Sequence, residues 1–107
     1  MKYCCVLSTV SSIKKARILA GLLVSRQLAA CVQILPGLES HYRWHGRKET
    51  SREVLLLIKT QMSNYKKLEK TLLENHPYEV PEIICLPITK GSRSYLDWIS
   101  REVAAKR

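Results

Sequence analysis

The stretch from residue 31 to residue 60, CVQILPGLESHYRWHGRKETSREVLLLIKT, decides the fold. The apolar run that opens it predicts a strand, which continues past a break at Pro36-Gly37 as far as Trp44. His45-Gly46 then signals a turn, and residues 52–60 return as a second apolar strand. The pattern therefore predicts a β-hairpin.

This hairpin is long for so small a protein. Cys31 to Trp44 is 14 residues, about 45 Å if extended, whereas an ordinary strand spans roughly 17–20 Å. The whole chain has 107 residues, which predicts a single domain over residues 1–107. A domain of that size cannot cover such a hairpin, so we expect its tip, with Tyr42 and Trp44, to project beyond the core.

Hydrophobic periodicity predicts five further elements. In chain order they are a strand at residues 3–9, a helix at 13–27 capped by Ser11 or Ser12, a helix from Ser63 to His76, a strand at 83–88 and a helix at 95–103. The order β-α-β-β-α-β plus a last helix is typical of an α+β, ferredoxin-like fold. Two helices then cover one face of a four-stranded antiparallel sheet.

The edges of this predicted sheet are not protected within one chain. The hairpin projects, and Pro87 indicates that the end of the last strand lies at an edge or a bulge. Unpaired strand edges must be covered, and copies of the same chain are the simplest cover. We therefore predict a symmetric homo-oligomer.

A rigid corner, His76-Pro77-Tyr78-Glu79-Val80-Pro81-Glu82, follows the second helix. Its two prolines fix the backbone and remove donors, which excludes helix interior and central strand. The corner holds an imidazole, a phenol and two carboxylates at set spacings. It is either a structural corner or one that also lines a binding site.

The chain is strongly basic, with 18 Lys and Arg against 9 Asp and Glu and a net charge of +9. This charge permits nucleic-acid binding, so a basic nucleic-acid-binding module stays an alternative. The basic residues are spread along the chain without interleaved aromatics, and a solvated basic surface explains them better. We expect no nucleic-acid partner.

Neither a membrane nor a disulfide framework is expected. No run approaches the roughly 18 apolar residues of a membrane span. The four cysteines form no C-x-x-C pair and lie within apolar runs. Buried free thiols are typical of the reducing cytoplasm, where we place the protein.

Several motifs in order resemble those of the CutA family of divalent-cation tolerance proteins. The resemblance covers residues from about 4 to 103 and rests on Ala29-Ala30-Cys31-Val32, Pro36-Gly37, Tyr42-x-Trp44-x-Gly46, Ile58-Lys59-Thr60, His76-Pro77-Tyr78-x-x-Pro81-Glu82 and Gly91-x-x-x-Tyr95-Leu96-x-Trp98. It implies a homotrimer of ferredoxin-like subunits, similar in shape to the PII signalling proteins and joined through the long hairpin. It also implies a role in tolerance to copper and other divalent ions, with no enzymatic reaction.

Metal binding is the first candidate chemistry, with copper or another divalent ion as the implied cofactor. Proposed copper sites of bacterial relatives use a cysteine near the end of the first strand and two adjacent histidines. Those positions resemble Ser8, Asn75 and His76 here, so only His76 keeps a ligand. We expect His41 and His45 to be exposed.

The second candidate is a ligand cleft between subunits. A lysine, a phenol, a carboxylate and an indole near strand ends suit a small anionic or zwitterionic molecule: Lys59, Tyr78, Glu82 and Trp98. The alternatives are a solvent-exposed Lys59, a Trp98 that only anchors the core or an interface, and a salt bridge from Glu82 to Lys59 or Arg101.

The sequence thus predicts a non-catalytic protein that binds a divalent metal ion or a small ligand between the subunits of a homotrimer. It has no G-x-S-x-G nucleophile motif and no phosphate-binding glycine loop. A PII-like small-molecule signalling trimer is the other alternative.

Overall fold

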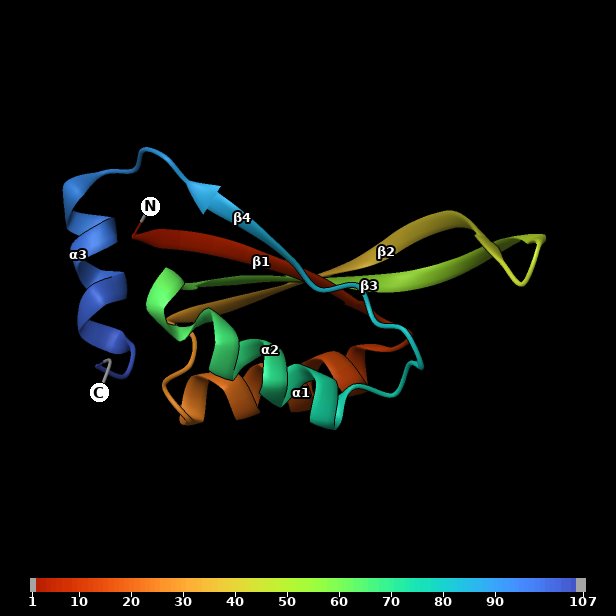
Figure 1. The fold of residues 1–107 in the computed structure, drawn as a ribbon, viewed down its shortest axis with the longest axis horizontal. Helices are drawn as coiled ribbons and strands as arrows, with labels where there is room; N and C mark the ends of the chain where they lie inside the picture. The colour runs from red at the N-terminus through yellow and green to blue at the C-terminus, as the bar shows by residue number, and fades with distance from the viewer. Residues whose placement is uncertain (1, 106–107) are drawn as a thin grey trace.

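A computed structural model describes residues 2–105 as a twisted four-stranded antiparallel sheet with helices (Figure 1). The strand order is β2-β3-β1-β4, so the α+β, ferredoxin-like arrangement is confirmed. The elements are β1 (Tyr3–Val10), α1 (Ile13–Ser25), β2 (Cys31–Trp44), β3 (Arg47–Gln61), a 3-10 turn (Met62–Asn64), α2 (Tyr65–Asn75), β4 (Ile84–Ile88) and α3 (Arg93–Glu102).

Helices α1 and α2 cover one face of the sheet (Figure 1), as the periodicity predicted. Alternate side chains of each strand point to this face, and on β3 they include Leu56 and Ile58, which are fully buried. Leu23 of α1 and Leu68 of α2 meet them in a single core. Burial of this apolar surface is the main force that holds the helices on the sheet.

The opposite face of the sheet is apolar but largely uncovered. Leu57 of β3 and Leu7 of β1 lie opposite each other on it and are half-buried. On β4, Leu86 keeps 44% of its surface exposed. Helix α3 lies at the end of the sheet where both termini are found (Figure 1), and Ser100 hydrogen-bonds Tyr3 there at 2.6 Å.

The β2–β3 hairpin extends far past the rest of the sheet (Figure 1). Strand β1 ends where Val10 pairs with Val54, whereas the β2–β3 ladder continues to Trp44 opposite Arg47. We call the part beyond β1, residues 38–53, the arm. It gives the chain a long axis of 43 Å against 26 and 21 Å, so the projecting tip predicted from the sequence is present.

The arm turns at a two-residue loop. His45 and Gly46 have φ values of +49° and +76°, the pair of left-handed conformations that a type I′ hairpin turn requires. The return strand begins directly after this turn at Arg47, five residues earlier than the apolar run indicated. Polar residues form this part of the ladder because the backbone pairing needs no apolar side chain.

Of the two helix caps predicted from the sequence, one is confirmed and the other is wrong. Ser12 caps α1 by accepting a hydrogen bond from the Lys15 amide at 3.2 Å. The expected cap at Ser63 is wrong, because a 3-10 turn comes first and Asn64 occupies the cap position without a side-chain bond.

The structure of residues 2–105 also bears on the predictions that the cysteines are buried free thiols and that no segment spans a membrane. All four cysteines are free, but only Cys4 is buried and the other three are half-buried. Burial, with Cys85 as a hydrogen-bonding neighbour, raises the pKa of Cys4 to about 12, so this thiol stays protonated. No helix within the described part of the chain is long and apolar enough to cross a membrane.

Replacing a buried isoleucine by alanine should cost much more stability than the same replacement at an exposed isoleucine. Ile58→Ala removes a fully buried side chain and should lower the free energy of unfolding by about 2–5 kcal/mol. Ile18→Ala, where Ile18 is 61% exposed on α1, should change it by less than about 0.5 kcal/mol. Urea unfolding followed by circular dichroism measures both, and equal costs would contradict this placement of the core.

Candidate binding cleft

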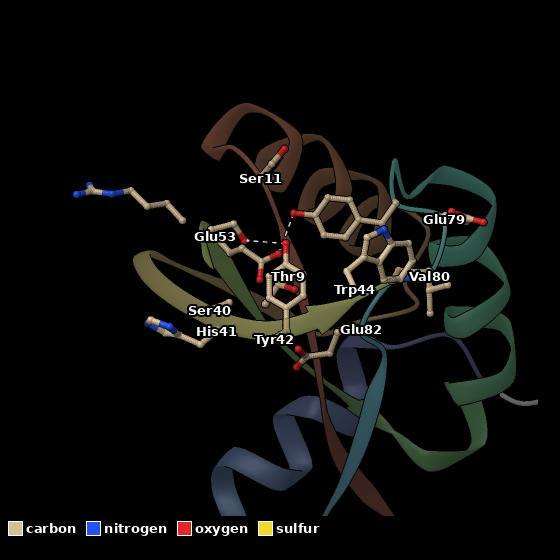
Figure 2. Close-up of a pocket in the computed structure, with 14 residues that line it drawn as sticks. Thr9, Ser11, Ser40, His41, Tyr42, Trp44, Glu53, Glu79, Val80 and Glu82 are labelled. Atoms are coloured by element: carbon tan, nitrogen blue, oxygen red, sulfur yellow. Dashed lines mark hydrogen bonds between the residues drawn. The ribbon is translucent and has the colours of Figure 1, made fainter. Parts of the chain in front are cut away.

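A cavity of about 740 Å³ lies between the arm and the proline corner, residues 76–82 (Figure 2). The arm contributes Tyr42, Trp44 and Glu53 to its lining, and the corner contributes Tyr78 and Glu82. Two predicted cleft residues, Tyr78 and Glu82, are therefore brought together. The corner lines a cavity as well as turning the chain.

His76 fixes the corner to the end of β1. Its Nδ1 lies 3.1 Å from the Tyr78 amide, which donates to it, so Nε2 carries the proton and donates to the Thr9 carbonyl at 2.8 Å. Burial lowers the pKa of His76, while the Thr9 bond and Glu53 act in the opposite direction. The imidazole is thus held in one neutral tautomer by two backbone groups.

Tyr78 then joins the corner to the arm. Its hydroxyl donates to Glu53 Oε2 at 2.8 Å. Burial, together with this bond to a carboxylate, raises the pKa of Tyr78 to about 12, so the phenol stays neutral. One edge of the cavity is therefore a phenol–carboxylate pair that links β3 to the segment after α2.

Two further aromatic rings come from β2. Tyr42 and Trp44 are alternate residues, so they project from the same side of the strand. Figure 2 shows Tyr42 between Glu53 and Glu82 and Trp44 farther toward Val80, while His41 points away. Their exposed fractions are 43% and 40%, so a large part of each side chain is accessible to solvent.

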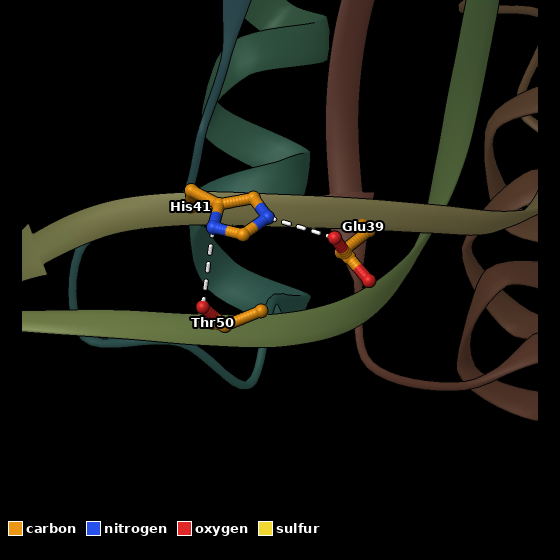
Figure 3. Close-up of polar contacts among 3 residues, drawn as sticks. All are labelled: Glu39, His41 and Thr50. Carbon is orange, nitrogen blue, oxygen red and sulfur yellow. Dashed lines mark hydrogen bonds and ion pairs between the residues drawn. The ribbon is translucent and has the colours of Figure 1, made fainter.

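The other side of the arm carries a second polar cluster (Figure 3). His41 Nε2 lies 2.7 Å from Glu39 Oε2, and His41 Nδ1 lies 3.2 Å from Thr50 Oγ1. Glu39 and His41 are largely solvent-exposed. The predicted exposure of His41 and His45 is confirmed, and an exposed pair of this kind adds little to stability.

The remaining two predicted cleft residues lie elsewhere. Lys59 pairs with Cys31 on one side and Cys5 on the other, and its ammonium donates to Gln33. Trp98 lies on α3, where its ring packs against Tyr95 with centroids 5.6 Å apart.

The positions of Lys59 and Glu53 on β3 show how far Lys59 lies from the cavity. Lys59 is six positions beyond Glu53, about 20 Å along an extended strand. Within one chain the four residues are therefore not brought together, because only Tyr78 and Glu82 line the cavity. The alternative salt bridge from Glu82 to Lys59 or Arg101 is not formed between residues 2 and 105.

No preformed metal centre is present among the described residues, where no three His, Cys, Asp or Glu side chains group around a common point. Ser8 is fully buried, and Asn75 donates its side-chain amide to the Thr71 carbonyl. His76 has both ring nitrogens engaged, so a metal ion at Nδ1 would have to replace the Tyr78 amide.

The sequence reasoning missed Glu53. Leu57, Leu55 and Glu53 are alternate residues on the same face of β3, and the change from leucine to glutamate marks where the uncovered apolar face ends. That change in the sequence could have pointed to Glu53 as a site residue. The contact between Glu53 and Tyr78 could not have been predicted, because it joins residues 25 positions apart.

A family model and several known proteins match this chain. The family model described as CutA1 divalent ion tolerance protein matches residues 4–102. A Thermus thermophilus protein named divalent-cation tolerance protein CutA is 51% identical over 94 residues, 88% of this chain and 91% of that protein. A chloroplastic CutA of Arabidopsis thaliana is 46% identical over 85% of this chain, which spans half of that longer protein.

Solved structures agree with these sequence matches. The divalent cation tolerance protein of Thermus thermophilus superposes with a TM-score of 0.93 at 47% identity, over 95% of this chain and 99% of that one. The CutA1 structure of Oryza sativa gives a TM-score of 0.94 at 41% identity, over 97% and 95%. The long arm is therefore part of a fold that these solved structures share.

The state of His76 predicts how stability depends on pH. The pKa of His76 is lowered in the folded chain, so below about 6.5 the unfolded chain binds more protons. The stability contributed by the neutral ring is complete above that pH and is lost as the pH falls through the folded pKa. We expect the free energy of unfolding to decrease from pH 7.5 to pH 5.

Two variants test the assignment. His76→Gln keeps a donor for the Thr9 carbonyl but does not titrate, so the decrease between pH 7.5 and pH 5 should become smaller. His45→Asn suits the same turn and removes an exposed imidazole, so it should leave the decrease unchanged. An undiminished pH dependence in His76→Gln would contradict this role.

Proposed function

The chain belongs to the CutA1 divalent ion tolerance family, and from this premise we propose that it acts in divalent-cation tolerance as a homotrimer. The trimer binds a divalent metal ion or a small ligand in clefts between its subunits and catalyses no reaction. Its half-buried free cysteines suit a reducing compartment, and we place it in the cytoplasm.

The proposed homotrimer is supported by surfaces that a single chain leaves uncovered. The uncovered sheet face presents the leucines of β1, β3 and β4 to solvent, and the arm adds strand edges without partners. Large exposed apolar patches mark interaction sites, and unpaired edges favour association. Copies packed through these surfaces would cover both at once.

The clefts follow from the same assembly. Lys59 and Trp98 lie at the α3 end of a chain, whereas Tyr78 and Glu82 lie at the arm end. An arm that reaches onto a neighbouring copy would bring its own Tyr78 and Glu82 toward the neighbour's other end. This complementarity supports a cleft that two subunits complete.

A metal ion, copper among the candidates, is one possible occupant. His76 is the predicted ligand, and imidazole is a good donor for Cu(II) and Zn(II). Its Nδ1 lone pair already accepts from the Tyr78 amide, so binding there competes with an internal hydrogen bond. Further donors from a second subunit would be needed to make a tight site.

The assembly is tested by a pair of leucine-to-aspartate and isoleucine-to-aspartate variants. At micromolar concentration the wild-type chain should sediment as a trimer. Leu86→Asp introduces a charge on the uncovered sheet face and should dissociate it, whereas Ile18→Asp on the outside of α1 should not. A stable wild-type monomer would contradict both the assembly and its clefts.

Calorimetric titration with Cu(II) and Zn(II) tests the metal ligand. If His76 binds the ion, His76→Gln should weaken binding by at least about the tenfold that loss of an outer-shell group costs, because the ligand itself is removed. His45→Asn is the control and should leave the isotherm unchanged. Identical isotherms for the wild type and His76→Gln would eliminate His76 as a ligand.

A further inference from the structure

We infer that Cys4, Cys85 and Met62 form a binding site for one Cu(I) ion inside each subunit, which we call the sulfur site. The chain holds six sulfur atoms, four in cysteines and two in methionines, and three of them belong to this site. They come from β1, β4 and the 3-10 turn after β3. The inference goes beyond the proposed function, because the sulfur site uses neither His76 nor a residue of a second subunit.

The register of β1 and β4 places the two thiols on the same face of the sheet. Cys85 lies opposite Val6, and Cys4 lies opposite Pro87, so the cysteines are diagonal neighbours whose side chains can reach each other. Cys4 and Val6 are fully buried in the core under the helices, and Cys85 packs against that core. After burial, the Cys85 thiol is the neighbour that contributes most to the raised pKa of Cys4.

Met62 supplies the third sulfur. The Cys85 thiol donates to Met62 Sδ, with the two sulfur atoms 3.6 Å apart. A metal ion with metal–sulfur bonds of about 2.3 Å holds its sulfur ligands about 4 Å apart, so this pair already has the spacing that a shared ion requires. The Met62 amide donates to the Lys2 carbonyl at 2.7 Å, which fixes the turn beside the start of β1.

The kind of donor determines which ion fits. Thiolate and thioether are soft ligands that suit Cu(I), whereas hard ions such as Mg(II) prefer oxygen. Zn(II) usually takes four nitrogen, oxygen or thiolate ligands, and within residues 2–105 no third His, Cys, Asp or Glu joins the two thiols. Two thiolates and a thioether therefore favour Cu(I) over the divalent ions considered for His76.

Burial of the sulfur site shields a bound ion while leaving it a path of entry. Cys4 is fully buried, whereas Cys85 and Met62 are half-buried, so an ion enters past these two residues. Burial, then Glu69 and the two thiols, raise the pKa of Tyr65 to about 12, so its neutral phenol lies near the sulfur site. On binding, each thiol releases its proton to solvent and bonds to Cu(I), with no change in oxidation state.

Competition with a coloured Cu(I) chelator, bathocuproine disulfonate, measures this binding. Under anaerobic conditions the reduced wild-type protein should withdraw one Cu(I) per chain from the chelator, and a tenfold excess of Zn(II) should not displace it. Because binding releases thiol protons, lowering the pH from 7.5 to 6.5 should weaken it by about tenfold or more. No withdrawal of Cu(I), or an affinity that does not change with pH, would overturn the inference.

Matched cysteine variants then locate the ion. Cys85 and Cys5 are both half-buried, but Cys5 follows Cys4 on β1 and points to the opposite face of the sheet. Cys85→Ala should weaken Cu(I) binding by at least about tenfold, and Cys5→Ala should leave it unchanged. Met62→Leu conserves side-chain volume and so keeps the fold, yet it should also weaken binding. Equal effects of the two cysteine variants, or unchanged binding in Met62→Leu, would overturn the inference.

Two further measurements distinguish the sulfur site from the proposed function. The sulfur site lies on the face that α1 and α2 cover (Figure 1), away from the uncovered face proposed for assembly. In sedimentation, a monomer that withdraws one Cu(I) supports the sulfur site and contradicts the trimer, whereas a trimer that withdraws none does the reverse. His76→Gln should leave Cu(I) binding unchanged, and loss of Cu(I) in that variant would overturn the inference.

Discussion

The β2–β3 ladder extends beyond the end of β1, and the other features of the molecule depend on this difference in strand length. Strand β1 ends opposite Val54, while β3 begins at Arg47. The residues before Val54 therefore pair on one side only, with β2. An arm paired in this way cannot share the core, so its side chains are available for contacts with the corner and with other molecules.

A single change of side chain on β3 divides the uncovered face into two regions. Leu57 and Leu55 form an apolar surface that suits another protein surface, and Glu53 begins a polar one that suits a ligand. The bond from Tyr78 to Glu53 and the bonds of His76 to Thr9 and Tyr78 hold the corner against the arm. The cavity is thus built on backbone-anchored contacts, which limits how far it can open without breaking them.

The sequence predicted the element order, the projecting arm, the edge position of β4 and the helix-covered face, because all of these follow from local periodicity and strand length. It could not predict the partner of Tyr78 or the tautomer of His76, which depend on how segments far apart in the chain meet. The placement of Lys59 away from Glu82 also depends on register. The predicted cap at Ser63 is wrong for a local reason, since a 3-10 turn precedes α2, as is frequent at the N-termini of α-helices.

The net charge of +9 does not decide by itself which ligand the cleft prefers. At physiological salt the Debye length is about 8 Å, so exposed lysines and arginines farther away act only weakly on a bound ligand. Glu53 and Glu82 line the cavity itself, so their charges would act on a bound ligand at short range. Local carboxylates and rings, and not the charge of the whole chain, therefore set which ligand the cleft prefers.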